Sequence, residues 1–124
     1  MLPKELVHGN DHKWMKFYDK IASKYFLFFH IIIPVFTLGI EELTRRMWIE
    51  LLELRKGDIV LDIATGTGKN LPYLAKKIGN EGIIYGIDIS LGMLKYATRT
   101  SQKKRNIIPI RANASYLPFK NNCF

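Results

Sequence analysis

A glycine-rich stretch at residues 61–70, LDIATGTGKN, has the residue types that allow close contact with a ligand. Glycine has no Cβ, so it tolerates tight turns and lets the backbone approach a bound molecule. Asp62 precedes the glycines and Lys69 follows them. Such a loop could hold a triphosphate, a dinucleotide or a ligand without phosphate, and the neighbouring residues distinguish these cases.

Two phosphate-binding patterns do not fit this loop. The triphosphate pattern G-x-x-x-x-G-K-[ST] needs glycine where the chain has Ile63, and a hydroxyl residue for Mg²⁺ where it has Asn70. The dinucleotide pattern G-x-G-x-x-G needs a third glycine where the chain has Leu71. The triphosphate reading fails, and the dinucleotide reading is weak.

The acidic residues favour a ligand with a ribose and a cationic group. Asp62 lies beside the loop, where its charge would repel phosphates. Asp88 ends the next predicted strand, where a carboxylate can accept hydrogen bonds from both ribose hydroxyls. Ribose without phosphate, together with a cationic head, describes S-adenosylmethionine, which is therefore the expected cofactor.

Short apolar runs and helical stripes alternate around the loop. This alternation predicts a Rossmann-like, doubly wound α/β unit. Ser90 is placed to cap the second helix. Pro109 cannot donate a ladder hydrogen bond, so its strand should lie at an edge of the sheet. The expected strands are 59–64, 83–88 and 107–112, and the expected helices start at Leu71 and after Ser90.

The N-terminal part of the chain predicts helices rather than strands. Apolar residues recur at three- and four-residue steps over 11–25, and a second such stripe runs from Ile40 to Leu54. The turn at 56–58 should end this second helix. We therefore divide the chain into a helical extension or lid, residues 1–56, and half of a cofactor-binding domain, residues 57–124.

The segment 25–40, YFLFFHIIIPVFTLGI, contains no Asp, Glu, Lys or Arg. It is shorter than the roughly 20 residues needed to span a bilayer as a helix. Its Pro34 also tends to break or kink a helix. The segment therefore predicts a buried or interfacial element, with peripheral contact at a membrane surface as an alternative to plain packing.

The composition indicates one small globular domain. There are 124 residues, with 19 Lys and Arg against 11 Asp and Glu, a formal charge of +8. No nucleic-acid motif accompanies this charge, so we expect no nucleic-acid partner. The single Cys123 excludes an internal disulfide and suits a reducing compartment. We expect a cytoplasmic protein, at the membrane surface if residues 25–40 contact lipid.

Four stretches carry a family resemblance: VLDIATGTG, then GIDIS with GML, then RANASYLPF, and YDKIASKY near the N-terminus. The first three resemble, in order, the motifs of class I S-adenosylmethionine-dependent methyltransferases. The fourth is similar to the opening helix of the ubiquinone/menaquinone biosynthesis C-methyltransferases. The resemblance covers most of residues 17–124 and implies methyl transfer to a small lipophilic acceptor, such as a quinol ring carbon.

The resemblance also implies a role for each cofactor-binding residue. The glycine loop would face the methionine portion with an acid beneath it, a second acid would hold the ribose, and other residues would contact the adenine. The loop residues are Gly66, Thr67 and Gly68, and the acid beneath the methionine portion is Asp62. The ribose-binding acid is Asp88. Ile89 and Met93 would sandwich the adenine, and Asn113 and Ala114 would contact its edge.

Plainer interpretations stay open for several of these residues. Met93 at helical spacing could be an ordinary core residue. Asn113 could hydrogen-bond its own backbone in a loop. Asp88 could simply end a strand. No metal is expected, and no residue can be assigned as catalytic from the sequence.

The residues that would contact the methyl acceptor are less defined than those that would bind the cofactor. His30 could act as a base, but a histidine in an apolar run is more often packed. Tyr18, Tyr25 and residues 26–40 could form a lid or the walls of a hydrophobic acceptor site, or only pack on the sheet. The ubiquinone/menaquinone biosynthesis C-methyltransferases commonly have acidic residues at the positions of Phe26 and Lys69, so this chain departs from the family pattern at both.

The resemblance implies a seven-stranded sheet in the order 3-2-1-4-5-7-6, of which the sequence accounts for strands 1 to 3. Strand 1 would then lack a neighbour on one side. Two hypotheses follow for the chain. It is the N-terminal part of a methyltransferase that needs a complementing C-terminal half, or it is a non-catalytic truncated fragment that binds cofactor weakly or associates with a membrane surface.

Overall fold

A three-stranded parallel sheet is the centre of the fold in the computed structural model, which describes residues 10–102 and 104–124. The strand order is β1-β2-β3, with Ile59 paired to Ile83 and Ile84 paired to Ile107. This is the Rossmann-like α/β arrangement that the sequence predicts. The strands are β1 (Ile59–Ile63), β2 (Ile83–Asp88) and β3 (Ile107–Arg111).

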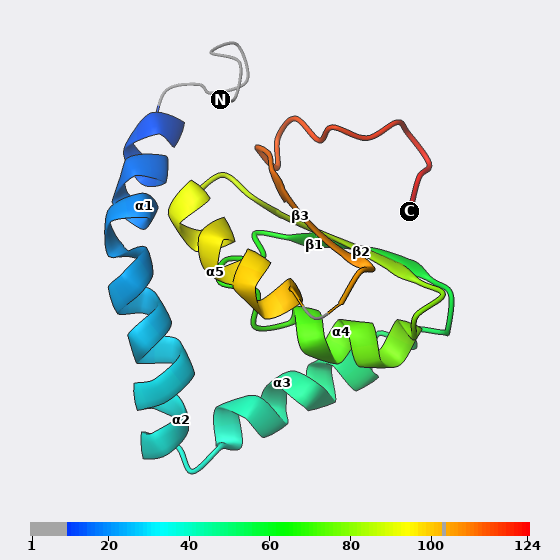
Figure 1. Ribbon diagram of the computed structural model, residues 1–124, viewed down its shortest axis with the longest axis horizontal. Helices are drawn as coiled ribbons and strands as arrows, with labels where there is room; N and C mark the ends of the chain where they lie inside the picture. Colours follow the sequence, from blue (N-terminus) through cyan, green and yellow to red (C-terminus); the bar gives the residue numbers. More distant parts are fainter. Residues whose placement is uncertain (1–9, 103) are drawn as a thin grey trace.

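Helices α4 (Leu71–Ile78) and α5 (Leu91–Ser101) connect the strands and pack on one face of the sheet (Figure 1). The Oγ of Ser90 accepts a hydrogen bond from the Met93 N–H and so caps α5, as predicted. The core joins residues from both helices and the strands beneath them. Its fully buried members include Leu71, Ile78 and Ile84.

The opposite face of the sheet lies against the segment that follows β3. Tyr85 of β2 packs edge-on against Phe119, with ring centroids 5.2 Å apart, and against Phe124 at 6.0 Å. Successive residues of a strand point to opposite faces, which explains why Tyr85 lies here while its neighbour Ile84 is in the core. The chain returns across this face after leaving β3 (Figure 1).

Both outer strands are edges among the described residues. Pro109 lies in β3, at one edge, which confirms the prediction from its missing N–H. β1 forms the other edge, where Ile59 and Ile63 are half exposed.

The N-terminal helices form one long, slightly irregular rod followed by a sharp turn (Figure 1). Helix α1 (Asp11–Leu27) continues into a π-helical stretch, η2 (Phe28–Ile32), and then α2 (Ile33–Phe36). Pro34 lies in the first turn of α2, where its missing N–H is tolerated. The wider π-helical turn of η2 lies immediately before α2, on the side where a proline ring crowds the preceding turn. Helix α3 (Ile40–Glu50) starts after Gly39, which has a left-handed φ of +80°.

Two expectations for this region need correction. No residue of the segment 25–40 is buried, so the buried alternative for this segment is wrong, while the interfacial alternative stays a prediction. Helix α3 also ends at Glu50 rather than near Leu54. Glu53 has a positive φ of +52°, a conformation that a helix cannot contain, so the chain leaves the helix before this residue.

Candidate cofactor site

The loop between β1 and α4 uses its two glycines for different purposes. Both have left-handed backbone, with φ of +57° at Gly66 and +80° at Gly68. A Cβ on Gly66 would meet nothing closer than 3.9 Å, so its backbone is open to a ligand. A Cβ on Gly68 would lie 2.8 Å from Leu71 Cδ1 and 2.9 Å from Ala97 Cα. Gly68 therefore lets α4 and α5 pack closely under the loop.

Asp88, at the end of β2, holds two backbone turns together. Its Oδ2 accepts the Gly66 N–H at 2.9 Å, and its Oδ1 accepts the Ser90 N–H at 2.9 Å. An ionised carboxylate offers about four acceptor sites, so each oxygen can accept a further hydrogen bond. The carboxylate is thus fixed in place with capacity left for the two hydroxyls of a ribose.

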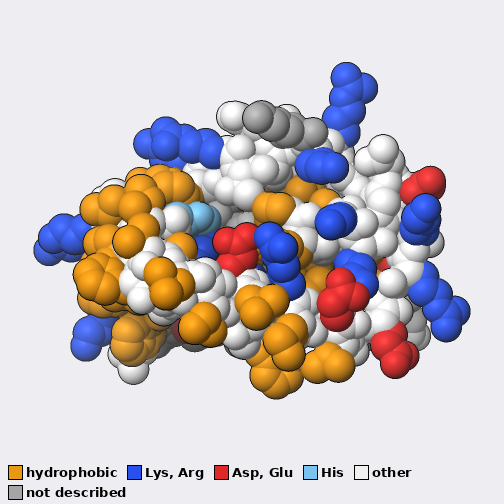
Figure 2. All heavy atoms as spheres, turned by 90° about the horizontal axis from the view of Figure 1, so that it is seen from below, with side chains coloured by type: hydrophobic (Ala, Val, Ile, Leu, Met, Phe, Trp, Pro, Cys, Tyr) orange, Lys and Arg blue, Asp and Glu red, His pale blue; other side chains and the backbone are white. Residues whose placement is uncertain are grey.

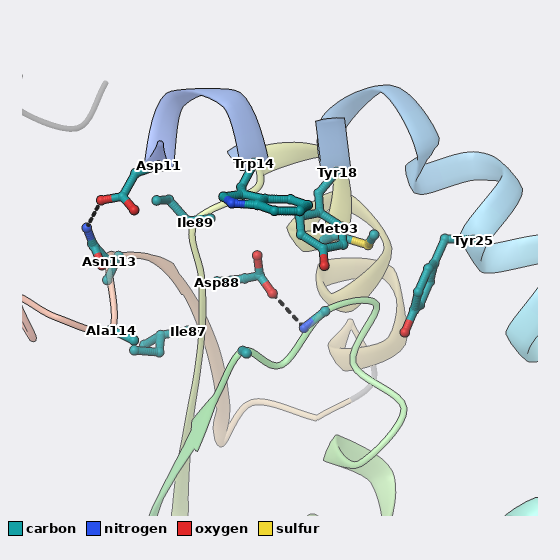
Figure 3. A pocket seen from close by; sticks show the side chains of 13 residues that line it. Asp11, Trp14, Tyr18, Tyr25, Ile87, Asp88, Ile89, Met93, Asn113 and Ala114 are labelled. Atoms are coloured by element: carbon teal, nitrogen blue, oxygen red, sulfur yellow. Dashed lines mark hydrogen bonds between the residues drawn. The ribbon is translucent and has the colours of Figure 1, made fainter. Parts of the chain in front are cut away.

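A cavity of about 350 Å³ opens beside Asp88 and the glycine loop (Figure 3). Four groups line it: side chains from α1, the loop after β1, residues at the carboxyl ends of β2 and β3, and Met93 of α5. Ligands of open α/β sheets bind at these carboxyl ends. The lining residues are Asp11, Trp14, Tyr18, Tyr25, Ala64, Gly66, Ile87, Asp88, Ile89, Met93, Ala112, Asn113 and Ala114.

Helix α1 is fixed over this cavity by its contact with the start of α5. Asp19 Oδ1 accepts hydrogen bonds from Ser90 Oγ at 2.5 Å and from the Gly92 N–H at 2.8 Å. A Cβ on Gly92 would lie 2.9 Å from Asp19 Cα and 3.0 Å from Ala22 Cβ, so the glycine permits this close approach.

The docked helix presents aromatic rings to the cofactor site. Figure 3 shows Trp14 and Tyr18 projecting from α1 toward Asp88, with Tyr25 farther along the same helix. Sequence reasoning treated Trp14 as an ordinary apolar position and did not select Asp11. The signal was present, because Trp14, Tyr18 and Tyr25 are spaced by four and seven residues and so share one helical face.

The structure brings together most of the residues predicted to bind the cofactor, though not all. Those that line the cavity are Gly66, Asp88, Ile89, Met93, Asn113 and Ala114. Those that lie outside the lining are Asp62, Thr67 and Gly68.

Met93 and Asn113 each have both of the roles that the sequence left open: a structural role, and a place in the lining of the cavity. Met93 is buried and belongs to the packing of α5, yet it also lines the cavity. Asn113 Oδ1 accepts the Ser115 N–H at 3.0 Å, a local loop bond, while its Nδ2 donates to Asp11 Oδ2 at 3.0 Å. Asn113 therefore joins α1 to the loop after β3 at the border of the cavity.

Asp62 lies under the glycine loop rather than in the cavity. Its Oδ2 accepts the Thr65 hydroxyl at 2.7 Å, and its Oδ1 lies 3.5 Å from Asn70 Nδ2. Burial raises the pKa of the Asp62 carboxyl above its ordinary value, although the hydrogen bonds from Thr65 and Asn70 act in the opposite direction.

Replacing Asp62 with asparagine should therefore raise the free energy of unfolding at neutral pH. Above the ordinary pKa of 3.8, the folded chain holds this proton more tightly than the unfolded chain does. Wild-type stability consequently falls as pH rises from 3.8 through the raised pKa, and the variant lacks this loss. Urea unfolding at a series of pH values measures the difference. If the free energy of unfolding of the variant, taken relative to wild type, fell as pH rises, this would contradict a raised pKa for Asp62.

The turn of the loop that carries Thr67 faces the helical extension. Thr67 is buried, and its Oγ1 lies 2.8 Å from His30 Nε2. The His30 ring stacks on Phe26, which also stacks on Tyr96 of α5. Burial, followed by the charge of Lys69, lowers the pKa of His30, so its ring is neutral at pH 7. In this position His30 joins η2 to the loop.

Helix α3 is joined to the same loop by charged residues. Glu41 accepts from Lys69 Nζ at 2.6 Å and from Arg45 Nη2 at 2.5 Å. Arg45 Nη1 also donates to Asn70 Oδ1 at 2.5 Å. Lys69, one of the two departures from the family pattern, thus has an acidic partner supplied by this chain.

The chemical groups that line the site fit S-adenosylmethionine. Asp88 offers acceptors at the end of β2, and Gly66 leaves its backbone accessible. The aromatic faces of Trp14 and Tyr18 suit a cationic group. The fold and site define the class: a Rossmann-like S-adenosylmethionine-dependent methyltransferase domain.

Comparison with known proteins places the chain more narrowly. Residues 6–124 match the profile of the ubiE/COQ5 methyltransferase family, and the chain belongs to this family. It is 33% identical over 110 residues to "Ubiquinone/menaquinone biosynthesis C-methyltransferase UbiE" of Wigglesworthia glossinidia brevipalpis, covering 86% of this chain and 42% of that protein. The protein of the same name from Teredinibacter turnerae is 36% identical over 110 residues, covering 86% and 43%.

A solved structure supports the same class. The crystal structure of a SAM-dependent methyltransferase from Aquifex aeolicus is 31% identical with a TM-score of 0.58, covering 63% of this chain and 43% of that one. The chain spans less than half the length of the curated relatives just described.

Proposed function

We propose that this chain forms the cofactor-binding part of a methyltransferase that acts in ubiquinone/menaquinone biosynthesis. The acceptor would be the ring carbon of a quinol, or another small lipophilic molecule. One observation carries the proposal: the cavity in which Asp88 and Gly66 meet the aromatic residues of α1. The relatives' names supply the pathway.

The chain's own residues would act by alignment. S-adenosylmethionine supplies an activated methyl group, so the protein mainly has to position the partners and exclude water. Asp88 would hold the ribose, and α1 would cover the cofactor. Tyr25 lines the cavity, where its hydroxyl could donate a hydrogen bond, and burial raises the pKa of this hydroxyl. No base is assigned.

We also propose that a further strand pairs along β1. Ile59 and Ile63 are 49% and 50% exposed at this edge. An apolar strand edge of this kind is a template for strand pairing. A second cavity, of about 620 Å³, is lined in part by Trp48 of α3 and by Leu52, which follows that helix. A complementing C-terminal segment would cover both features.

The alternative is a non-catalytic chain that binds the cofactor without turning it over. We keep this alternative because the chain spans less than half the length of these relatives. Cofactor binding alone does not separate the two functions, whereas methyl transfer does. In either case the exposed Cys123 suits a reducing compartment, and we propose a cytoplasmic location.

A chimera tests the methyltransferase proposal. This chain would replace the matching N-terminal part of the Teredinibacter turnerae relative, and transfer of a labelled methyl group to an unmethylated quinol would be measured. We expect turnover by the chimera and none by the 124-residue chain alone, because the proposal requires a further strand along β1, whose Ile59 and Ile63 are half exposed.

The matched control is the same chimera carrying Asp88→Ala, which should be inactive. A folded chimera that binds cofactor but transfers no methyl group to the quinol would contradict the proposed acceptor. Turnover by the chain alone would contradict the need for a complementing segment.

A further inference from the structure

The corner between α2 and α3 exposes an unusual amount of apolar surface. Val35, Phe36 and Leu38 are 67%, 83% and 91% exposed. Figure 2 shows hydrophobic side chains gathered in one area of this face, with Lys and Arg side chains at its border. We call residues 27–40 the apolar tip. It contains no Asp, Glu, Lys or Arg.

A line of lysines leads along α1 to the apolar tip. Its members are exposed and recur at steps of three and four residues, which places them on one helical face. Leu27 and Ile31 continue the same spacing, so the charged line becomes an apolar one toward the tip. The lysines are Lys13, Lys16, Lys20 and Lys24.

This face is separate from the cofactor site. Trp14 and Tyr18 line the cavity, and a helix turns by about 100° per residue, so Lys13 and Lys20 point away from it. The lysine line and the apolar tip could therefore be covered by a partner while α1 remains docked over the cavity.

We propose that the apolar tip and the lysine line together form a docking surface for an anionic lipid bilayer. The tip would enter the interface between headgroups and acyl chains, and the lysines would lie over the headgroups. Amphipathic elements bind membranes by this combination of buried apolar area and attraction to anionic lipid. The positive charge beside the tip is what favours a membrane over a neutral apolar partner.

The geometry suits shallow insertion. Within the described residues, no single helix is long and apolar enough to cross a membrane. The pair Asp11–Phe36 and Ile40–Glu50 passes that test only together, and it is bent by 104°. The apolar tip lies at this bend, which is the part of the pair that a bilayer surface would meet first.

Co-sedimentation with vesicles tests the proposal, using the 124-residue chain without cofactor or acceptor. One set of vesicles is phosphatidylcholine alone, and the other is an equal mixture with phosphatidylglycerol. We expect binding to the mixed vesicles that weakens as salt is raised. The variant Val35→Ser/Phe36→Ser/Leu38→Ser should bind at least about tenfold more weakly.

Charge reversal is tested separately. Lys20→Glu/Lys24→Glu should weaken binding at least about tenfold, since each lysine near an anionic surface contributes about fivefold. The matched controls are Leu91→Ser/Leu117→Ser and Lys95→Glu/Lys104→Glu, which change exposed residues outside the apolar tip and the lysine line and should bind like wild type.

Three results would overturn the proposal: no binding to the mixed vesicles, equal binding to both vesicle types, or unchanged binding by the tip variant. Light scattering tests whether a second copy of this chain, rather than a bilayer, covers the apolar tip. A dimer that the tip variant returns to monomer, with no vesicle binding, would make a second copy the partner. The assay contains no cofactor, so its failure leaves the proposed methyl transfer untouched.

Discussion

Asp88→Ala should weaken binding of S-adenosylmethionine at least about 100-fold, measured by calorimetric titration, because two hydrogen bonds to a charged acceptor contribute about 1.5–3 kcal/mol each. The carboxylate is already oriented by the Gly66 and Ser90 N–H groups. It would therefore receive the ribose hydroxyls without reorganising. The substitution removes these acceptors and also releases the loop backbone.

The control for this prediction is Asp58→Ala. Asp58 also accepts a backbone N–H, from Arg55 at 2.7 Å, but it precedes β1 at the opposite end of the sheet. We expect this variant to bind the cofactor like wild type. Asp88→Ala with unchanged affinity in a folded sample would exclude Asp88 as the ribose-binding residue.

Gly68→Ala should lower the free energy of unfolding by about 3 kcal/mol. A non-glycine residue in left-handed backbone costs about 1–2 kcal/mol, and overpacking a tight contact adds about 1–3 kcal/mol. The new methyl group would meet the Cα of Ala97, which is backbone and cannot rotate away. Urea unfolding followed by circular dichroism measures the loss.

Gly57→Ala is a matched control for the contact. Gly57 has a similar φ of +89°, but nothing lies within 4 Å of its added Cβ. It should lose only about 1–2 kcal/mol, the backbone part of the effect. Equal losses at the two glycines would show that the packing of α4 and α5 under the loop does not depend on Gly68.

The strands and helices from Ile59 onward could be predicted because local patterns determine them. β2 and the Ser90 cap match their sequence predictions, since a buried strand and a capped helix each leave a short-range signal. Pro109 identified an edge because its missing N–H acts wherever the strand lies.

The N-terminal part of the site could not be predicted in the same way. The position of Trp14 depends on how α1 meets α5, through Asp19 and Gly92, which are far apart in sequence. The contact of His30 with Thr67 is equally non-local. Hydropathy alone favoured burial of residues 25–40, but burial depends on how far other elements cover them, and α5 and the glycine loop cover only part of this segment through Tyr96 and Thr67.

The cavity beside Asp88 and Gly66 should bind S-adenosylmethionine. The most direct measurement is a calorimetric titration of the purified, folded chain with S-adenosylmethionine, beside the same titration with a nicotinamide dinucleotide. We predict saturable binding of one S-adenosylmethionine per chain and no binding of the dinucleotide, because the loop has Leu71 where the dinucleotide pattern needs glycine. No heat with S-adenosylmethionine from a folded sample, or preference for the dinucleotide, would contradict this prediction.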